Sequence, residues 1–482
     1  MCRGRVFHSK SFGSEPPCVG SYLKRGLTGL LRLIIFLLLV QAWCRPAFGT
    51  EYSNLPPVIP PLEFFDKKQP LPNLLLQDKR SGSYITGFPA IGVDPDSGFT
   101  YGAALQWYNN GPTNSPFFRY TPYRQKLAVG ATGSTGGTRQ AVAVWDQPFL
   151  GDSPWRLRAV GVLQGVKFQN YFGIGSQTLN PLSFPGSPLT YTRYSDYYDA
   201  INKVQNGQTW SRYNSYYRQQ AFGGITLERS CDGGLLRPLI GFQLSRIKVT
   251  DYTGDIINGA VEQPTLLYTD YQNGSITGFN GGWDNALKLG LTYDTRDFEP
   301  DPTQGVVLML CSRIVGTWIG STYDYEQLTL SARYFYNLLE RPRRLIFAVR
   351  GLYSMEFGNI PFYSYPDMPF TDGDVDGLGG WNTLRGYKQN RFVGHDAAVL
   401  NGELRWTFGE ANFVGQHLSF MLAPFVDSGC VFNSIAQSTF KDWKVDAGLG
   451  FRLAWNLSTV VSFDYAISSE SALFNMQLGQ LF

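Results

Sequence analysis

The stretch AVLNGELRWTF, residues Ala398–Phe408, alternates between two kinds of side chain. The even-numbered positions are apolar or glycine: Ala398, Leu400, Gly402, Leu404, Trp406 and Phe408. The odd-numbered positions are mostly polar or charged: Val399, Asn401, Glu403, Arg405 and Thr407. Because successive side chains of a β-strand point to opposite faces, this stretch predicts a strand with one apolar face and one charged face.

A second stretch, Lys444–Asn456, repeats the pattern. Its apolar positions are the odd-numbered ones: Val445, Ala447, Leu449, Phe451, Leu453 and Trp455. Its even-numbered positions include charged and small residues: Lys444, Asp446, Gly448, Gly450, Arg452 and Asn456. A membrane barrel would turn the apolar set to lipid and the charged set to its lumen. A soluble β-sandwich would bury the apolar set instead.

Composition separates these two alternatives. Charged residues make up 16% of the chain, against about 25% in ordinary soluble domains. The chain also contains 28 Tyr, 34 Phe and 53 Gly. Low charge and many aromatic residues, without long apolar runs, favour a membrane β-barrel.

Residues 1–49 resemble a secretory signal. The longest strongly apolar run, Leu33–Val40, has eight residues, whereas a membrane-spanning helix needs about 20. Basic residues precede the run and small residues follow it, so we expect cleavage after Gly49. The next part, residues 50–83, contains six prolines and predicts an extended periplasmic segment.

The remaining charge and the scarce reactive residues exclude several functions. The whole chain carries +3; residues 1–49 hold seven Lys or Arg and one Glu, so 34 basic and 37 acidic residues remain, a net charge of −3. This excludes a strongly basic nucleic-acid binder. The remaining cysteines, Cys231, Cys311 and Cys430, predict no disulfide framework, and His395 and His417 lie near no nucleophile motif. We therefore expect no catalytic residues, no metal site and no cofactor.

From Tyr84 to Phe482 the alternation predicts an all-β fold with sixteen strands. They span 84–93, 99–109, 123–134, 139–149, 155–170, 216–229, 236–250, 283–296, 305–315, 324–338, 344–357, 397–408, 417–432, 444–456, 459–468 and 472–482. Three connections are long: 171–215, 251–282 and 358–396. Short turns at one end and long loops at the other are typical of a single antiparallel outer-membrane barrel, here 84–482.

Four groups of residues occur in an order that resembles a known family. Tyr293–Asp297, with Asp294, Arg296 and Asp297, is followed by Gly305. Then come Gly379–Tyr387 with Arg391-Phe392, Asn401–Arg405, and Phe425–Gly429. This order resembles the BamA/TamA superfamily of outer-membrane insertases, also called the bacterial surface antigen family. The resemblance covers about residues 84–482.

The resemblance implies that the long loop 358–396 folds into the lumen and is pinned there by its Arg385-Gly386-Tyr387 motif. Strand alternation independently turns Glu403 and Asp427 inward. A guanidinium entering the lumen would find two carboxylates, so we predict contacts of Arg385 with Asp427 and Glu403, near Gly429. Without the resemblance, the alternative is that Arg385 is solvated on an external loop.

The acidic run Asp372–Gly377 begins like a calcium-binding loop. Its twelfth position would be Thr383 rather than the bidentate Glu that such a loop needs. We interpret the run as an acidic loop tip.

One departure from the family concerns function. Insertases of the family carry POTRA domains before the barrel, and the 34 residues Thr50–Ser83 are too few to fold as one. We therefore expect a member without POTRA domains.

The resemblance implies protein insertion or translocation at the bacterial outer membrane, by a monomeric barrel that contacts the lipid bilayer and unfolded outer-membrane client proteins. A weak seam between 84–93 and 472–482 would receive the client. Phe474, Leu478 and Phe482 would form the last lipid-facing strand, an assembly signal. The alternatives are a passive or substrate-specific channel, and a surface-exposed interaction protein.

Overall fold

The computed structural model describes residues 55–482 except 300, 341–343, 414–415, 456–458 and 479–480. The predicted signal segment, 1–49, lies outside the described residues. No helix in the described part of the chain is long and apolar enough to cross a membrane.

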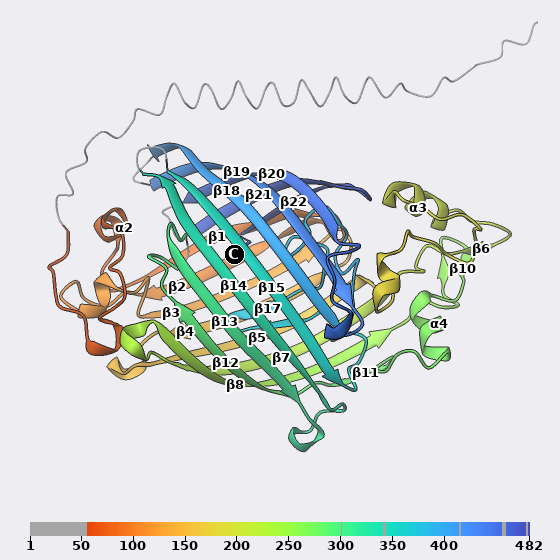
Figure 1. Cartoon of the computed structure of the whole chain (residues 1–482), viewed down its shortest axis with the longest axis horizontal. Helices are drawn as coiled ribbons and strands as arrows, with labels where there is room; N and C mark the ends of the chain where they lie inside the picture. The colour runs from red at the N-terminus through yellow and green to blue at the C-terminus, as the bar shows by residue number, and fades with distance from the viewer. Residues whose placement is uncertain (1–54, 300, 341–343, 414–415, 456–458, 479–480) are drawn as a thin grey trace, which may run out of the picture. The chain divides into compact units, whose positions relative to one another are not determined.

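Sixteen long strands form a closed antiparallel barrel within the described residues (Figure 1). They are β1 (Ser83–Asp94), β2 (Gly98–Asn109), β3 (Gln125–Ser134), β4 (Arg139–Gln147), β5 (Trp155–Asn170), β7 (Ser215–Arg229), β8 (Leu236–Thr250), β12 (Ala286–Asp294), β13 (Gly305–Val315), β14 (Tyr325–Leu339), β15 (Leu345–Gly358), β18 (Asp396–Phe413), β19 (Gln416–Phe432), β20 (Lys444–Trp455), β21 (Thr459–Ser468) and β22 (Ala472–Leu478). A short strand, β11 (Gly281–Trp283), precedes β12 and also pairs with β8. The prediction of one sixteen-stranded barrel is confirmed, and 155–170, 236–250, 305–315 and 459–468 match to the residue.

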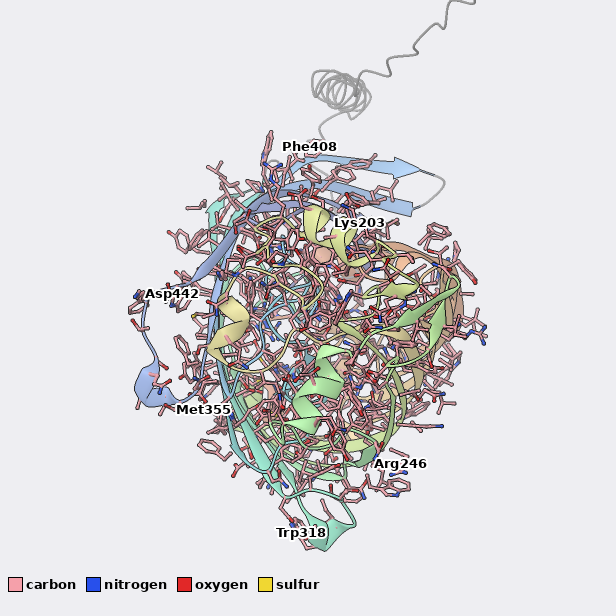
Figure 2. The ribbon with its side chains drawn as sticks, turned by 90° about the vertical axis from the view of Figure 1, so that its right-hand side faces the viewer. Lys203, Arg246, Trp318, Met355, Phe408 and Asp442 are labelled. Atoms are coloured by element: carbon pink, nitrogen blue, oxygen red, sulfur yellow. The ribbon has the colours of Figure 1, made fainter. Side chains whose placement is uncertain are left out.

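Short elements occupy the connections. They are the helices α2 (Asn73–Asp78), α3 (Tyr194–Ile201) and α4 (Leu266–Gln272), the strands β6 (Gln208–Thr209), β9 (Ile256–Ile257), β10 (Ala260–Glu262), β16 (Met368–Phe370) and β17 (Gly373–Val375), and the 3₁₀ turns η1 (Glu63–Phe65), η2 (Pro116–Arg119), η3 (Leu150–Asp152), η4 (Ser176–Leu179), η5 (Asp232–Gly234), η6 (Thr317–Ile319) and η7 (Ile435–Gln437). The elements α3, α4, β6 and β10 lie at one end of the barrel, and α2 lies at the other (Figure 1). In Figure 2, which looks onto the former end, the long connections lie across the barrel opening.

The two faces of the barrel wall differ as the alternation predicts. Along β8 buried and exposed residues alternate, with Arg237 and Gln243 buried and Ile240 and Phe242 exposed. Polar side chains therefore face the interior and apolar side chains face outward. This is the arrangement of a membrane barrel, and it is the reverse of a soluble sandwich.

The sheet closes through a weak seam. β1 pairs with β2 along its whole length, from Ser83↔Asn109 to Asp94↔Gly98. Its pairing with β22 in the described residues is the single position Val93↔Met476. The first and last strands are therefore joined by far less backbone pairing than their other neighbours.

The end of the last predicted strand, 472–482, is corrected. β22 ends at Leu478, and within it Phe474 is exposed on the outer face, as predicted. Phe482 does not continue this face: it is buried inside against Phe335 and Ala348. Once the chain leaves the strand, the alternation of side chains no longer constrains it, and the aromatic ring is free to turn inward.

Residues 55–82 were predicted to be extended, yet they pack against the short-turn end of the barrel. The Phe65 ring is fully buried against Phe117 and Phe149. Arg119 Nη1 donates to the Pro56 carbonyl at 2.8 Å. Apolar residues between the prolines need burial, and the turns of the barrel provide it.

Phe65→Ala should release this segment locally. Loss of a buried Phe side chain costs about 3–5 kcal/mol, enough to release the backbone around Lys67 and Lys68 from its docked conformation. Limited trypsin digestion of the folded barrel should show much faster cleavage there. Phe440→Ala is the matched control because Phe440 is 93% exposed. Equal cleavage rates in the two variants would contradict docking.

Candidate functional site: an arginine of the long loop inside the barrel

The connection between β15 and β18, residues 359–395, crosses the interior. Asp374 pairs with Lys288 Nζ at 3.0 Å and with Arg313 Nη1 at 3.1 Å, on the inner faces of β12 and β13. Asp367 pairs with Arg218 of β7 at 3.3 Å. The acidic run predicted as a loop tip thus supplies a counter-charge to cations of the barrel wall.

Arg385, in the same connection, lies within ion-pair distance of three carboxylates, those of Glu403, Asp427 and Asp464. Its Nε and Nη2 donate to the two carboxylate oxygens of Asp427 at 2.8 and 2.9 Å. Its Nη1 donates to Glu403 Oε1 at 2.6 Å. Its guanidinium also lies 3.4 Å from the ring centroid of Phe425, and no part of its side chain is exposed. The structure therefore brings Arg385, Glu403 and Asp427 together, in contacts that are bidentate on Asp427.

Three further residues complete the cluster. Asp464 Oδ2 lies 3.5 Å from Arg385 Nη1 and Asp464 Oδ1 accepts from Arg452 Nη1 at 2.5 Å. Arg405 Nε donates to Glu403 Oε2 at 2.9 Å. Three guanidinium groups thus meet three carboxylates, which is how buried charges avoid a large desolvation cost.

Alternation along the sequence predicts that Arg405 and Arg452 face the lumen, but it does not link them to Arg385. Alternation along a strand gives only the face on which a residue lies. The contact of Asp464 with Arg385 depends on the register between β18, β19, β20 and β21, which the structure supplies.

The glycines beside Arg385 and Asp427 are required by close packing. A Cβ on Gly386 would lie 2.7 Å from Asp446 Cβ, and a Cβ on Gly429 would lie 2.8 Å from Leu378 Cδ2. Leu378 is a fully buried residue of the loop. Both glycines therefore let the loop approach the barrel wall.

Tyr387 and Phe392 hold the next part of the loop. The Tyr387 hydroxyl donates to the Val445 carbonyl at 3.3 Å. Its ring packs edge-on against Phe392, with 5.1 Å between centroids. Both side chains belong to a buried apolar cluster between the loop and the wall.

Arg391 links this loop to two others. Its Nε donates to Glu470 in the β21–β22 turn at 2.8 Å, and its Nη1 donates to the Thr178 carbonyl of the loop before β7 at 2.5 Å. Sequence reasoning included Arg391 in the motif but missed Glu470, because no local pattern marks a partner 79 residues away.

The predicted motif residues Asp294, Arg296 and Asp297 lie in a different place. Asp294 accepts from Arg296 Nη2 at 2.8 Å, and Asp297 accepts from the Thr303 backbone N–H at 2.9 Å. Gly305 has φ +117, and a Cβ there would lie 2.6 Å from a backbone oxygen. These residues shape a turn at the short-turn end, and no hydrogen bond or ion pair among the described residues joins them to Arg385.

The Arg385 cluster also contacts residues at the seam. Asn475 of β22 donates to the Arg385 carbonyl at 3.4 Å, and Arg405 Nη2 donates to the Phe482 carbonyl at 2.8 Å. The Gln389 backbone N–H donates at 2.9 Å to Asp96, in the turn after β1. The loop thus contacts both sides of the seam.

Metal ligands are not gathered in the described part of the chain. It contains no group of three or more His, Cys, Asp or Glu residues that could hold a metal ion. The chemistry of the cluster is ionic pairing and hydrogen bonding.

Comparison with known proteins gives the family. Residues 178–482 match the Omp85 superfamily domain, so the chain belongs to that superfamily and is an outer-membrane β-barrel. Residues 61–124, the docked segment and first hairpin, match a domain of unknown function, DUF5982. No curated protein matches the sequence.

Several solved structures share the architecture at low identity. BamA from Haemophilus ducreyi lacking POTRA domains 1–3 is 15% identical with a TM-score of 0.48, over 83% of this chain and 70% of that one. CdiB from Escherichia coli is 10% identical with a TM-score of 0.49, and the match covers 84% of this chain and 68% of that one. CdiB from Acinetobacter baumannii is 11% identical with a TM-score of 0.46, and the match covers 83% of this chain and 60% of that one. This chain thus spans less than two thirds of the length of that last protein.

Arg385→Ala should destabilise the folded barrel by about 3–5 kcal/mol, because buried Asp427 loses the cation that pairs with it and Glu403 keeps only its contacts with Arg405 and Arg452. The destabilisation is measured as a decrease in the temperature at which the folded barrel's band disappears in gel electrophoresis. Arg385→Lys should recover only part of the loss, since an ammonium cannot bind Asp427 through two parallel N–H groups. Arg229→Ala, which removes an exposed arginine, is the control. If Arg385→Ala and Arg229→Ala melt at the same temperature, the cluster does not hold the loop.

Gly386→Ala should cost about 1–3 kcal/mol by overpacking against Asp446. The matched control is Gly402→Ala, where the nearest atom to an added Cβ is 4.0 Å away. Thermal midpoints of the two variants should differ clearly. Identical midpoints would show that the loop can move away from the wall without loss of thermal stability.

Proposed function

We propose that this protein inserts or translocates polypeptides at the outer membrane through the seam between β1 and β22. The observation that carries the proposal is the single paired position Val93↔Met476. Strand edges with few partners expose backbone N–H and C=O groups, and such edges bind extended polypeptide by adding a strand. Membership of the Omp85 superfamily supports the same role.

The loop would control that seam. Its contacts with Asn475 on one side and Asp96 on the other tie β22 to the turn after β1. These contacts cost little to break compared with a full strand pairing, whereas the Arg385 cluster is fully buried. The loop would therefore stay anchored on β18 and β19 while the seam opens.

The partners implied are the lipid bilayer and unfolded outer-membrane polypeptides, handled by one barrel without catalytic chemistry. A client strand pairs with the open edge through main-chain hydrogen bonds, so recognition depends on extended backbone more than on sequence. This explains how one seam would serve several clients.

A passive or substrate-specific channel is the second candidate. The loop side chains that fill the interior, Arg385 and Asp374 among them, argue against an open lumen. Large single-channel conductance in planar bilayers, with no effect on client folding, would favour the channel. The third candidate, a surface interaction protein, would be favoured if loop deletions abolish partner binding alone.

Locking the seam with a disulfide should abolish activity. The pair Val93→Cys and Met476→Cys lies within disulfide range because paired antiparallel residues have Cα atoms about 4.5–5.5 Å apart. Folding of an unfolded test barrel into liposomes should be accelerated by the reduced protein and not by the oxidised one. Cys231, Cys311 and Cys430, which are free, are replaced in every variant.

The control places the same cross-link inside the wall, at Leu449→Cys and Tyr465→Cys, which pair between β20 and β21. Its activity should not depend on oxidation. Empty liposomes and liposomes that contain the Arg385→Ala variant are further controls. Undiminished activity of the oxidised seam variant would rule out a mechanism in which the seam opens.

A further inference from the structure

The outer wall carries a row of residues that breaks its apolar character. Register places Arg139 of β4, Gly165 of β5, Gln219 of β7 and Lys248 of β8 side by side. Arg139 and Lys248 are exposed, on the outward face of their strands. Three strand spacings separate them, about 14 Å, so their long side chains can reach a common ligand.

A second row runs beside the first, one step towards the middle of the wall. It contains Ala141, Leu163, Ala221 and Arg246 in register. Leu163 is 64% exposed. Gly165 in the first row and Ala141 and Ala221 in the second have little or no side chain, so the surface is hollowed between the longer side chains around them.

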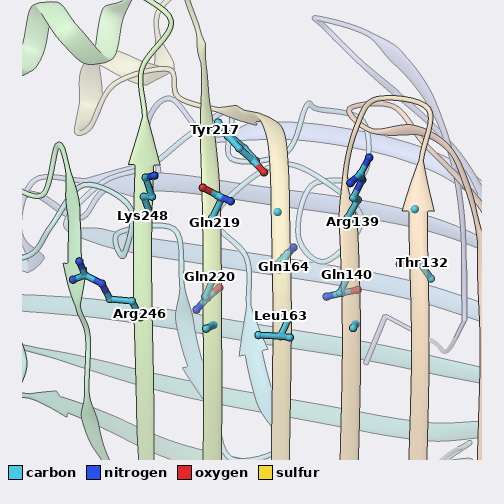
Figure 3. A pocket seen from close by; sticks show the side chains of 14 residues that line it. Thr132, Arg139, Gln140, Leu163, Gln164, Tyr217, Gln219, Gln220, Arg246 and Lys248 are labelled. Carbon is cyan, nitrogen blue, oxygen red and sulfur yellow. The ribbon is translucent and has the colours of Figure 1, made fainter.

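The depression has a volume of about 740 Å³ and is lined by residues of both rows, as Figure 3 shows for strands β3, β4, β5, β7 and β8. Ten of the fourteen lining residues lie at outward positions of their strands, Arg139, Leu163 and Lys248 among them, so the depression opens on the outer face. Thr132, Gln140, Gln164 and Gln220, at inward positions, also line it. Tyr217 borders it, with its hydroxyl 3.2 Å from where a Cβ on Gly165 would lie.

Its height on the wall is that of a membrane interface. On β8 the outward residues change from Ile240, Phe242 and Leu244 to Arg246 and Lys248 as the strand approaches the long loops. The Arg246 guanidinium lies 5.5 Å from the ring of Trp283, which is 47% exposed, and Figure 2 places Arg246 at the periphery. Exposed tryptophan and arginine at the edge of an apolar band are typical of the headgroup level.

The cations of the depression have no anionic partner in the described part of the chain. Arg139, Arg246 and Lys248 form no ion pair there, in contrast to the paired cations of the lumen. The lining residues include no Asp or Glu. Three positive groups thus surround a hollow whose lower edge, at Leu163, is apolar.

We propose that this depression binds the phosphorylated headgroup of a lipid in the leaflet on the long-loop side. Arg139, Arg246 and Lys248 would contact phosphate oxygens, since guanidinium and ammonium groups form charge-assisted hydrogen bonds with phosphate. Gln219 and Tyr217 would contact neutral hydroxyl groups of the headgroup, and the acyl chains would run along Leu163 and Leu244. The site is independent of the seam and of the function proposed above.

Purified, folded protein in nonionic detergent is titrated with diphosphoryl lipid A, and bound lipid is counted by native mass spectrometry. The triple variant Arg139→Gln, Arg246→Gln and Lys248→Gln should bind about tenfold more weakly or worse. Phosphatidylcholine, whose phosphate is neutralised by its own choline, should bind much more weakly to the wild-type protein. If the triple variant folds poorly, Lys248→Gln alone carries the test, with a smaller expected loss.

The matched control is Arg229→Gln. Arg229 is also exposed on the outer wall and lies 5.6 Å from a tryptophan ring, that of Trp155, but at the short-turn end of β7. The Arg229→Gln variant should bind lipid A with the same affinity as the wild-type protein. Equal lipid A binding by the triple variant, or equal binding of phosphatidylcholine and lipid A by the wild type, would overturn the proposal.

Discussion

The structure depends on one buried guanidinium, that of Arg385, between the carboxylates of Glu403 and Asp427. A charge withdrawn from water is tolerated only when it is paired with good geometry and its remaining polar atoms are satisfied. Meeting that requirement holds a long connection inside the barrel, where strand register also places Asp464 beside Arg385. The absence of side chains at Gly386 and Gly429 follows from it, because the loop must lie directly on the wall.

That anchoring contrasts with the closure of the barrel. The other neighbouring long strands pair at seven or more positions, while β1 and β22 pair in the described residues at Val93↔Met476. A firmly held loop touches both edges of this seam through a few hydrogen bonds, those of Asn475 and Asp96 being the clearest. In the proposed function, strong pairing inside and weak pairing at the seam would let one part of the wall move while the rest keeps its shape.

The cations on the two faces of the wall differ in how they are paired. Inside, cations meet carboxylates, as Lys288 and Arg313 meet Asp374. Outside, exposed apolar residues line the strands, and near the edge of this band Arg246 and Lys248 form no ion pair with any described residue. A lipid headgroup is the environment in which such unpaired cations are stable, because it supplies the anions that the chain omits.

The strands, their two faces and the inward position of Glu403 and Asp427 could be predicted from the sequence, because alternation with period two is a local property of the chain. The sequence also marked Arg385, through its place in a motif. The tertiary structure alone decided that Asp464, Arg452 and Glu470 complete the contacts, that Phe482 turns inward, and that residues 55–82 dock on the turns. These features depend on strand register and barrel closure, which bring residues far apart in the sequence to one place, and no local pattern records that.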